Sequence, residues 1–286
     1  MSEREGGERR PDGSWDPFPA SHEDRQTAKV KPDTAQTRSP TYRLAYDDPD
    51  FLASEAMRGV RLQLEMMKPE LKLKEEGILS TIVLFGGARI PEPGRPAWAA
   101  RNEEQKRRLE ANSRYYDEAR RFARLASQHS ANSSGGKEYV IVTGGGPGVM
   151  EAGNRGATDV GAVSIALNIT LPHEQMPNPY VTPELSFNFH YFALRKMHFL
   201  LRAKAIAIFP GGFGTMDELF EGLTLIQTGR MAKMPVILFG ESFWRRVLDF
   251  EFLAQEGTIA PDDLALLTFV ETAEDGWASI RKFYGF

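Results

Sequence analysis

One local order, an apolar run followed by a glycine-rich turn and a helical pattern, constrains the fold of this chain most strongly. Residues 205–209 read Ala-Ile-Ala-Ile-Phe, Pro210–Glu218 reads Pro-Gly-Gly-Phe-Gly-Thr-Met-Asp-Glu, and apolar residues with helical spacing follow from Leu219. Glycine lets the backbone approach a ligand closely, and a helix N-terminus offers unpaired N–H groups at the positive end of its dipole. The turn therefore predicts a site for an anion, most naturally a phosphate, with Glu218 one helical turn away.

The same residues also fit a purely structural interpretation. Thr215 and Glu218 have the spacing of a capping box, in which the threonine caps the helix and the glutamate reaches back to the backbone. This segment alone does not separate the two interpretations, whereas a second turn of the same kind favours the anion site.

Two further segments repeat the order of strand, glycine turn and helix. Tyr139–Val142 leads into Thr143–Gly148 and a helix that runs to Asp159, and Thr81–Phe85 leads less clearly into Gly86-Gly87-Ala88-Arg89. Strands that alternate with helices predict βαβ units, a parallel sheet and an α/β fold. Because ligands bind at the carboxyl edge of such sheets, we expect the glycine turns to form one concave floor there.

Neither main turn matches a standard nucleotide fingerprint. Val149 and Asp217 stand where the third glycine of Gly-x-Gly-x-x-Gly would be required, and the chain has no Gly-Lys-Ser/Thr triplet. A phosphorylated ligand smaller than NAD or ATP is therefore expected.

The composition excludes several other functions. A net charge of -4 gives no basic face for a nucleic-acid polymer, and the absence of cysteine excludes disulfides and thiolate catalysis. The five histidines lack the spacing of a metal site, and no Gly-x-Ser-x-Gly elbow marks a serine hydrolase. We expect no metal, no cofactor, no membrane partner, no secretory signal and a cytoplasmic location.

The chain divides into three expected parts. Residues 1–45 are polar and charged and are predicted to be a disordered or loosely ordered tail, residues 46–77 a helical segment that Pro69 breaks or opens, and residues 78–286 the nucleotide-binding catalytic domain. Within that domain the patterns predict helices over 101–129, 190–202 and 243–255, a loop over 130–136, and strands over 161–168, 185–189, 235–239 and 267–270.

Arg195 and Lys196 are candidates for contact with the anion. Adjacent helical residues point about 100° apart, so at most one of the two faces a given pocket. We assign Arg195 to the pocket because its planar fork suits phosphate or a transition-state oxygen; the alternative is two solvated cations. Glu151 either compensates a helix dipole or holds a ribose hydroxyl, and Asn154 lies one turn further on the same face.

The segments Gly144–Ala152, Arg195-Lys196 and Pro210–Glu218 together resemble the Lonely Guy family of cytokinin riboside 5′-monophosphate phosphoribohydrolases, often labelled lysine decarboxylase-like. Leu171–Tyr180 is similar to the longer bacterial branch, whereas Gly87 stands where the family often carries serine. The resemblance implies a Rossmann-like fold, a homodimer or larger homo-oligomer, and hydrolysis of a nucleoside 5′-monophosphate to base and ribose 5-phosphate. It also implies that Arg195 and Glu218 are catalytic.

Two alternatives stay open: a nucleosidase for ordinary purine or pyrimidine 5′-monophosphates, and a carrier of a phosphorylated cofactor similar to the molybdenum-cofactor carriers. A carrier has no need of Arg195 together with Glu218, which favours the enzyme. The expected substrate-binding residues lie in the three glycine turns, in the helices that follow two of them, and in the Arg-Lys pair: Gly86, Gly87, Arg89, Gly144, Gly145, Gly146, Gly148, Glu151, Asn154, Lys196, Gly211, Gly212, Gly214, Thr215 and Thr224.

Overall fold

The structure is a computed structural model that describes residues 8–9, 15–16, 18, 20–172 and 176–286. The chain separates into two compact units, Met1–Leu64 and Glu65–Phe286. The division falls inside one helix, α4 (Arg58–Glu75). The boundary expected at residues 77 and 78 stays a prediction, as does the disordered tail, part of which lies outside the described residues.

The first unit consists of short elements. None of its described residues from 18 onward is buried, so this unit has no apolar core of its own in the described region. Its elements are β1 (Glu8–Arg9), β2 (Trp15–Asp16), α1 (Ser21–Thr27), α2 (Ala35–Arg38), η1 (Pro40–Tyr42), η2 (Ala45–Asp47), α3 (Pro49–Ala53) and η3 (Glu55–Met57).

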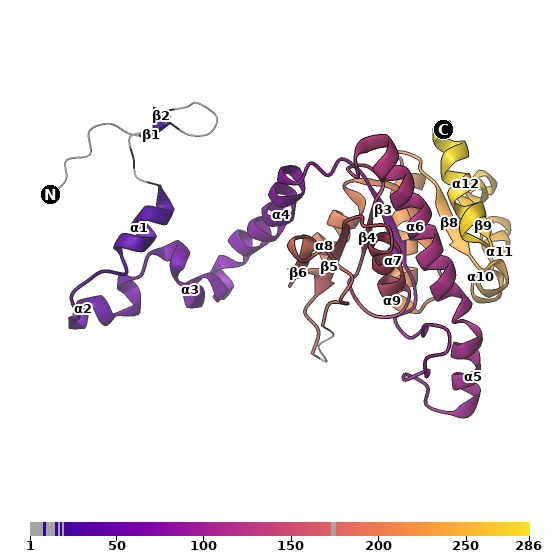
Figure 1. The fold of residues 1–286 in the computed structure, drawn as a ribbon, viewed down its shortest axis with the longest axis horizontal. Coiled ribbons are helices and arrows are strands. Elements are labelled where there is room, and N and C mark those ends of the chain that lie inside the picture. Colours follow the sequence, from indigo (N-terminus) through magenta and orange to yellow (C-terminus); the bar gives the residue numbers. More distant parts are fainter. Residues whose placement is uncertain (1–7, 10–14, 17, 19, 173–175) are drawn as a thin grey trace. The chain divides into compact units, whose positions relative to one another are not determined.

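The second unit contains a seven-stranded sheet in which every neighbouring pair is parallel (Figure 1). Strand order β6-β5-β4-β3-β7-β8-β9 places the first strand in the middle and winds outward in both directions, which is the Rossmann-like arrangement expected. The strands are β3 (Thr81–Phe85), β4 (Val140–Thr143), β5 (Ser164–Ile169), β6 (Ser186–Phe189), β7 (Ala203–Ile208), β8 (Val236–Phe239) and β9 (Leu267–Val270).

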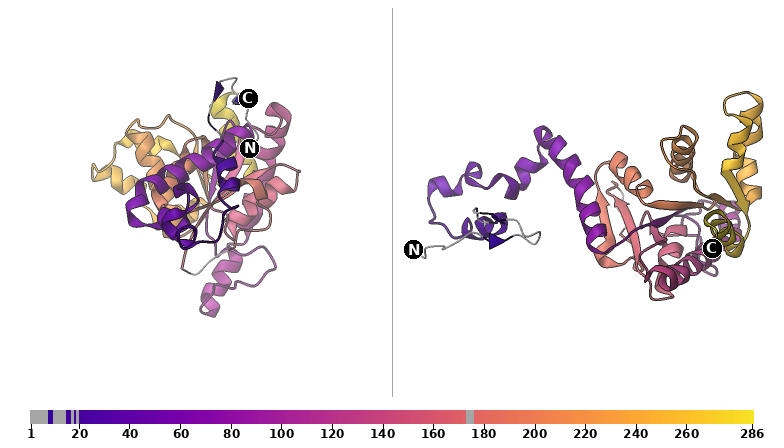
Figure 2. Two further views of the ribbon diagram at one scale, coloured as in Figure 1. Left: turned by 90° about the vertical axis from the view of Figure 1, so that its left-hand side faces the viewer. Right: turned by 90° about the horizontal axis from the view of Figure 1, so that it is seen from above.

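Helices cover both faces of this sheet (Figure 2). One core cluster joins alternate strand residues such as Ile82 and Leu84 to α6 (Arg114–Ser134), α7 (Val149–Thr158) and α12 (Ala273–Tyr284). The other joins Val83 and Phe85 to α8 (Phe192–Leu200), α9 (Phe213–Gln227), α10 (Glu241–Val247) and α11 (Phe250–Gln255). The alternation follows from the two-residue period of a strand, and it confirms the predicted α/β fold. Two short helices, η4 (Pro183–Leu185) and η5 (Pro261–Leu266), complete the unit.

Two predicted helices are each divided in the structure. The helix expected over 101–129 consists of α5 (Glu103–Ala111), which has no buried residue and projects from the unit in Figure 1, and of α6. The loop expected over 130–136 begins later, because α6 continues to Ser134 and ends at Gly135 with φ of 63°. The helix expected over 243–255 is α10 and α11, separated by the N-cap Asp249.

Pro69 neither breaks nor opens a helix, because it lies buried inside α4. A proline lacks the N–H that would bond the carbonyl four residues earlier, here that of Glu65. That carbonyl instead accepts a hydrogen bond from Nε2 of His198 on α8, at 3.0 Å. The interruption in the backbone ladder of α4 therefore provides a contact between α4 and α8. No helix in the described ranges is long and apolar enough to span a bilayer.

Candidate active site

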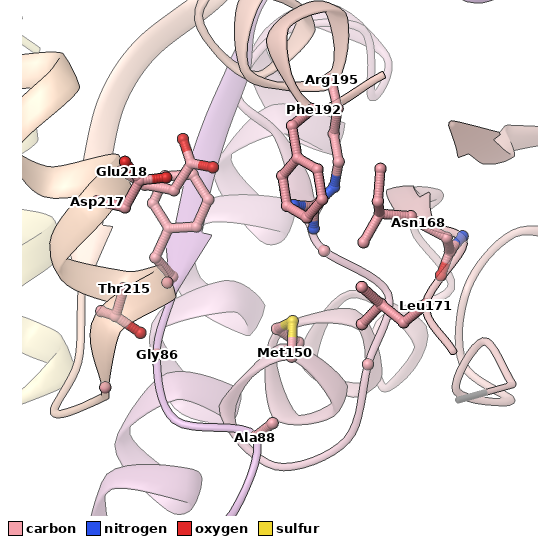
Figure 3. Close-up of a pocket in the computed structure, with 16 residues that line it drawn as sticks. Gly86, Ala88, Met150, Asn168, Leu171, Phe192, Arg195, Thr215, Asp217 and Glu218 are labelled. Carbon is pink, nitrogen blue, oxygen red and sulfur yellow. The ribbon is translucent and has the colours of Figure 1, made fainter. Parts of the chain in front are cut away.

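A cleft of about 280 Å³ lies where β3, β4 and β7 end (Figure 3). This is the edge at which the winding of the sheet reverses, so the topology explains its position. In Figure 3, Glu218 and Thr215 line one side, Asn168 and Leu171 the opposite side, and the Arg195 side chain reaches into the space between them. The cleft thus brings together the residues expected at 86, 144, 146, 195, 212, 214, 215 and 218.

The turn before α9 leaves its backbone donors open. The N-cap is Gly212 and no side chain caps the helix, so the capping-box interpretation of Thr215 and Glu218 is wrong. The N–H of Thr215 is bonded to the carbonyl of Gly212 at 3.0 Å. Among the described residues, however, no acceptor meets the N–H groups of residues 211–214. Four open donors at the positive end of a helix dipole are suited to an anion, and binding of a phosphate there stays a prediction.

The glycines of this turn serve different purposes. A Cβ on Gly211 would lie 2.7 Å from the Cβ of Thr215, so packing requires glycine there. A Cβ on Gly212 or Gly214 would meet nothing within 4 Å. The fold does not need glycine at those two positions, and their bare backbone keeps the cleft open beside the free N–H groups.

Glu218 is an unusual carboxyl for this position in a helix. It is 6% exposed, and no described residue forms a hydrogen bond with its side chain. Burial raises the pKa of Glu218 to about 7, against the opposing charges of Lys196 and Arg195. Desolvation outweighs the charges of the two cations, so this carboxyl exchanges its proton near neutral pH.

Arg195 is fixed by its inner nitrogen. Its Nε donates to the carbonyl of Leu167 at 2.7 Å, and its guanidinium carbon lies 5.0 Å from the ring centroid of Phe199. Burial lowers the pKa of Arg195, and Glu218 acts in the opposite direction. No described residue pairs with its Nη groups, which leaves them available to a ligand in the cleft.

The position of α8, which carries Arg195, is set by α4. Both carboxylate oxygens of Glu65 accept backbone N–H groups just before α8, from His190 at 2.8 Å and Tyr191 at 3.1 Å. Past the end of α8, Arg202 donates to Glu70 at 3.0 Å. The segment before the sheet therefore holds both ends of the helix on which Arg195 lies.

Sequence reasoning missed the apolar wall of the cleft. Met150, Leu171 and Phe192 line it, and Phe192 is 54% exposed. Asn168 lines it as well, with its amide nitrogen bonded to the carbonyl of Phe187 at 2.9 Å. One available signal was spacing: Phe192 lies three residues before Arg195 on one helix, so both share a face.

The turn before α7 is held by protein groups. A Cβ on Gly144 would lie 2.7 Å from Nη2 of Arg195, so the absence of a side chain at this position leaves space for the guanidinium. Gly145 and Gly148 have φ of 75° and 67°, and a Cβ on Gly148 would press on the backbone of Ala88. Asn178 donates its side-chain amide to the carbonyls of Gly145 and Gly146, both at 3.1 Å.

Several expected binding residues lie outside the cleft. Glu151 accepts a hydrogen bond from the hydroxyl of Tyr116 at 2.8 Å, and Asn154 is fully buried between Thr143 and Asn178. Their side chains are occupied by neighbouring elements, because α7 packs against α6 and the sheet. Thr224 donates to the carbonyl of Phe220, two turns below the cleft, and Lys196 pairs with carboxylates of α9. Gly87, Arg89 and Gly211 line a neighbouring cavity.

Comparisons with known proteins agree with the motifs. Residues 150–280 match the family described as "Possible lysine decarboxylase". The chain is 29% identical over 161 residues to the cytokinin riboside 5′-monophosphate phosphoribohydrolase LOG of Oryza sativa subsp. japonica, and the match covers 53% of this chain and 65% of the rice protein. These matches confirm the resemblance to the Lonely Guy family.

Solved structures with a similar arrangement are more distant. The molybdenum cofactor carrier protein of Chlamydomonas reinhardtii is 17% identical with a TM-score of 0.46, over 72% of this chain and 99% of that one. The structural-genomics protein TM1055 is 18% identical with a TM-score of 0.44, over 71% and 99%.

Proposed function

We propose that the chain hydrolyses the N-glycosidic bond of a nucleoside 5′-monophosphate and releases free base and ribose 5-phosphate. One observation carries this proposal: the buried, unbonded carboxyl of Glu218 shares a cleft with Arg195 and with the uncapped N-terminus of α9. The name of the rice relative describes the same class of reaction on cytokinin riboside 5′-monophosphates, which supports it.

The phosphate would lie on the N–H groups of residues 211–214. Each charge-assisted hydrogen bond contributes about 1.5–3 kcal/mol, so a few of them fix the ribose. The base would pack on the apolar wall formed by Met150, Leu171 and Phe192. This arrangement directs the anomeric carbon, C1′, toward Glu218, and the Nη groups of Arg195 would hold an oxygen of the ribose or phosphate.

In the reaction, the bond between C1′ and the base nitrogen breaks, and both electrons leave with the base. The positive charge that develops on the sugar is stabilised by the Glu218 carboxylate, as in glycosidases. Water then adds to C1′ and gives one proton to Glu218, while the departing base takes up one proton from solvent and Glu218 later returns its proton to solvent. A carboxyl with a pKa near 7 can both accept and return a proton at neutral pH.

The proposal also covers which base is preferred, the assembly of the protein, its location and its need for a cofactor. The preferred substrate is a cytokinin riboside 5′-monophosphate, as in the name of the rice relative. We propose an isoprenoid-substituted adenine as its base, and the alternative is a broad nucleosidase for ordinary 5′-monophosphates. A homo-oligomer, a cytoplasmic location and the absence of a cofactor belong to the same proposal.

Chromatographic detection of free base tests the reaction. The protein is incubated with isopentenyladenosine 5′-monophosphate, AMP and CMP, with Glu218→Gln as the control. Base released mainly from the first substrate is the expected result, and similar release from all three indicates the broad nucleosidase. Intact nucleotide in every incubation, with the protein still binding it, would overturn hydrolysis in favour of a carrier.

A further inference from the structure

Lys196 follows Arg195 in the chain but does not line the cleft. Its Nζ lies 2.9 Å from Oδ2 of Asp217 and 3.0 Å from Oε2 of Glu221, both on α9. Within the described ranges, these ion pairs are the only polar contacts that join α8 to α9. The Lys196 side chain is 15% exposed, so solvent screens its charge only in part.

The two partners of Lys196 flank Glu218. Asp217 precedes Glu218 directly and Glu221 follows it by three residues, so the ammonium is anchored on the helical turn of α9 that carries that carboxyl. Burial opposes the charge of Lys196, but the two carboxylates raise its pKa above the ordinary value, which keeps it protonated. The other charged groups around Glu218 are Arg195 from α8 and the two carboxylates themselves.

We propose that Lys196 is a positioning residue and not a substrate ligand: it ties α8 to α9, so that Arg195 and Glu218 face one cleft, and it offsets the carboxylates around Glu218. This inference rests on the role proposed for Glu218. It replaces the expectation that Lys196 binds substrate.

Charge balance supports this reading. One ammonium between two carboxylates leaves a local net negative charge, which repels a phosphate. Arg195 differs, because its outer nitrogens have no carboxylate partner among the described residues. The free N–H groups of residues 211–214 offer the phosphate a binding site that does not involve Lys196.

The test compares full-length wild type with Lys196→Met and Lys196→Arg. Carbon-13 NMR of glutamate carboxyls follows the titration of Glu218, assigned by its absence in Glu218→Gln, and needs no turnover. Steady-state kinetics with AMP gives kcat and KM against pH. Lys196→Gln provides a second neutral variant that can still hydrogen-bond Asp217, should Lys196→Met fold poorly.

Loss of the nearby positive charge should raise the titration midpoint of Glu218 by roughly 1 unit. The acidic limb of kcat/KM should move with it, because the reaction needs the carboxylate, while KM at its optimum changes less than about twofold and Lys196→Arg restores both midpoints. An unmoved midpoint in the neutral variants together with a KM raised about tenfold would overturn the inference and make Lys196 a ligand. A shifted midpoint in a protein that releases no base would retain the positioning role and refute the proposed reaction.

Discussion

The chain contains two glycine turns that look alike in sequence and differ in what fills them. In the Gly144–Gly148 turn, the side-chain amide of Asn178 donates to two backbone carbonyls, and Glu151, which follows the turn, is bonded to Tyr116. After Pro210–Gly214, the backbone N–H groups have no described acceptor and Glu218 has no hydrogen-bond partner. The first turn has two carbonyls and the following glutamate bonded within the protein, although the N–H groups of Gly144, Gly146 and Gly148 also have no described acceptor. In the second turn, both the N–H groups and the following glutamate are unbonded among the described residues. The contrast shows that the glycine motif predicts the geometry and that the surrounding side chains decide its use.

Replacement of Glu218 or Glu151 by glutamine should give the largest difference in activity between the two turns. Glu218→Gln should lower kcat by about 10³-fold, within the range for loss of a positioned acid–base group, because the developing sugar cation loses its carboxylate. Glu151→Gln keeps an acceptor for Tyr116 and should stay within about twofold of wild type. The rate of adenine release from AMP measures both effects. Equal losses of activity in the two variants would mean that the two turns do not differ in function.

Gly144→Ala should reduce activity without much loss of stability. The new Cβ meets the flexible ends of Arg195 at 2.7 Å and Met150 at 2.8 Å, which can move aside. Displacement of the guanidinium should cost about 100-fold in kcat/KM, the scale for one charged donor at a transition state. Gly148→Ala is the matched control, because φ of 67° and contact with the Ala88 backbone should make it unfold more readily. A Gly144→Ala enzyme with normal kinetics would refute the role of Arg195.

The raised pKa of Glu218 predicts a dependence of stability on pH. Because the folded state holds this proton up to about pH 7 and the unfolded chain releases it near 4.5, wild type loses stability as pH rises between those values. Glu218→Gln lacks that loss, so its free energy of unfolding relative to wild type should improve by about 2–3 kcal/mol from pH 5 to pH 8. Urea denaturation at both pH values measures the difference. A constant offset would mean that Glu218 is ionised in the folded protein throughout.

Gly214→Ala should have the smallest effect and should move stability and binding in opposite directions. Its Cβ meets nothing in the protein, and alanine in a helix is favoured over glycine by up to about 1 kcal/mol, so the melting temperature should not fall. The methyl group lies beside the free N–H groups, so KM for AMP should rise about tenfold, the value of roughly 1.4 kcal/mol. A thermal melt and a KM determination suffice. An unchanged KM would mean that the phosphate does not bind at this turn.

Much of the fold could be predicted from the sequence because its signals are local. The apolar run at residues 205–209 and the glycines after it fix β7, the turn and the start of α9 with little help from elsewhere. The use of Glu151 and Asn154 was not predictable, because their partners Tyr116 and Asn178 come from segments 35 and 24 residues away. Glu218 lines the cleft, and its catalytic role stays a prediction. Its proton affinity depends on burial, which the local motif does not reveal.

The most direct test of the account is a crystal structure of Glu218→Gln with AMP. We expect the phosphate within hydrogen-bond distance of the N–H groups of residues 211–214, the base against Phe192 and Met150, and C1′ facing the amide that replaces the Glu218 carboxyl. A phosphate bound at the Gly144–Gly148 turn, with C1′ remote from residue 218, would contradict it.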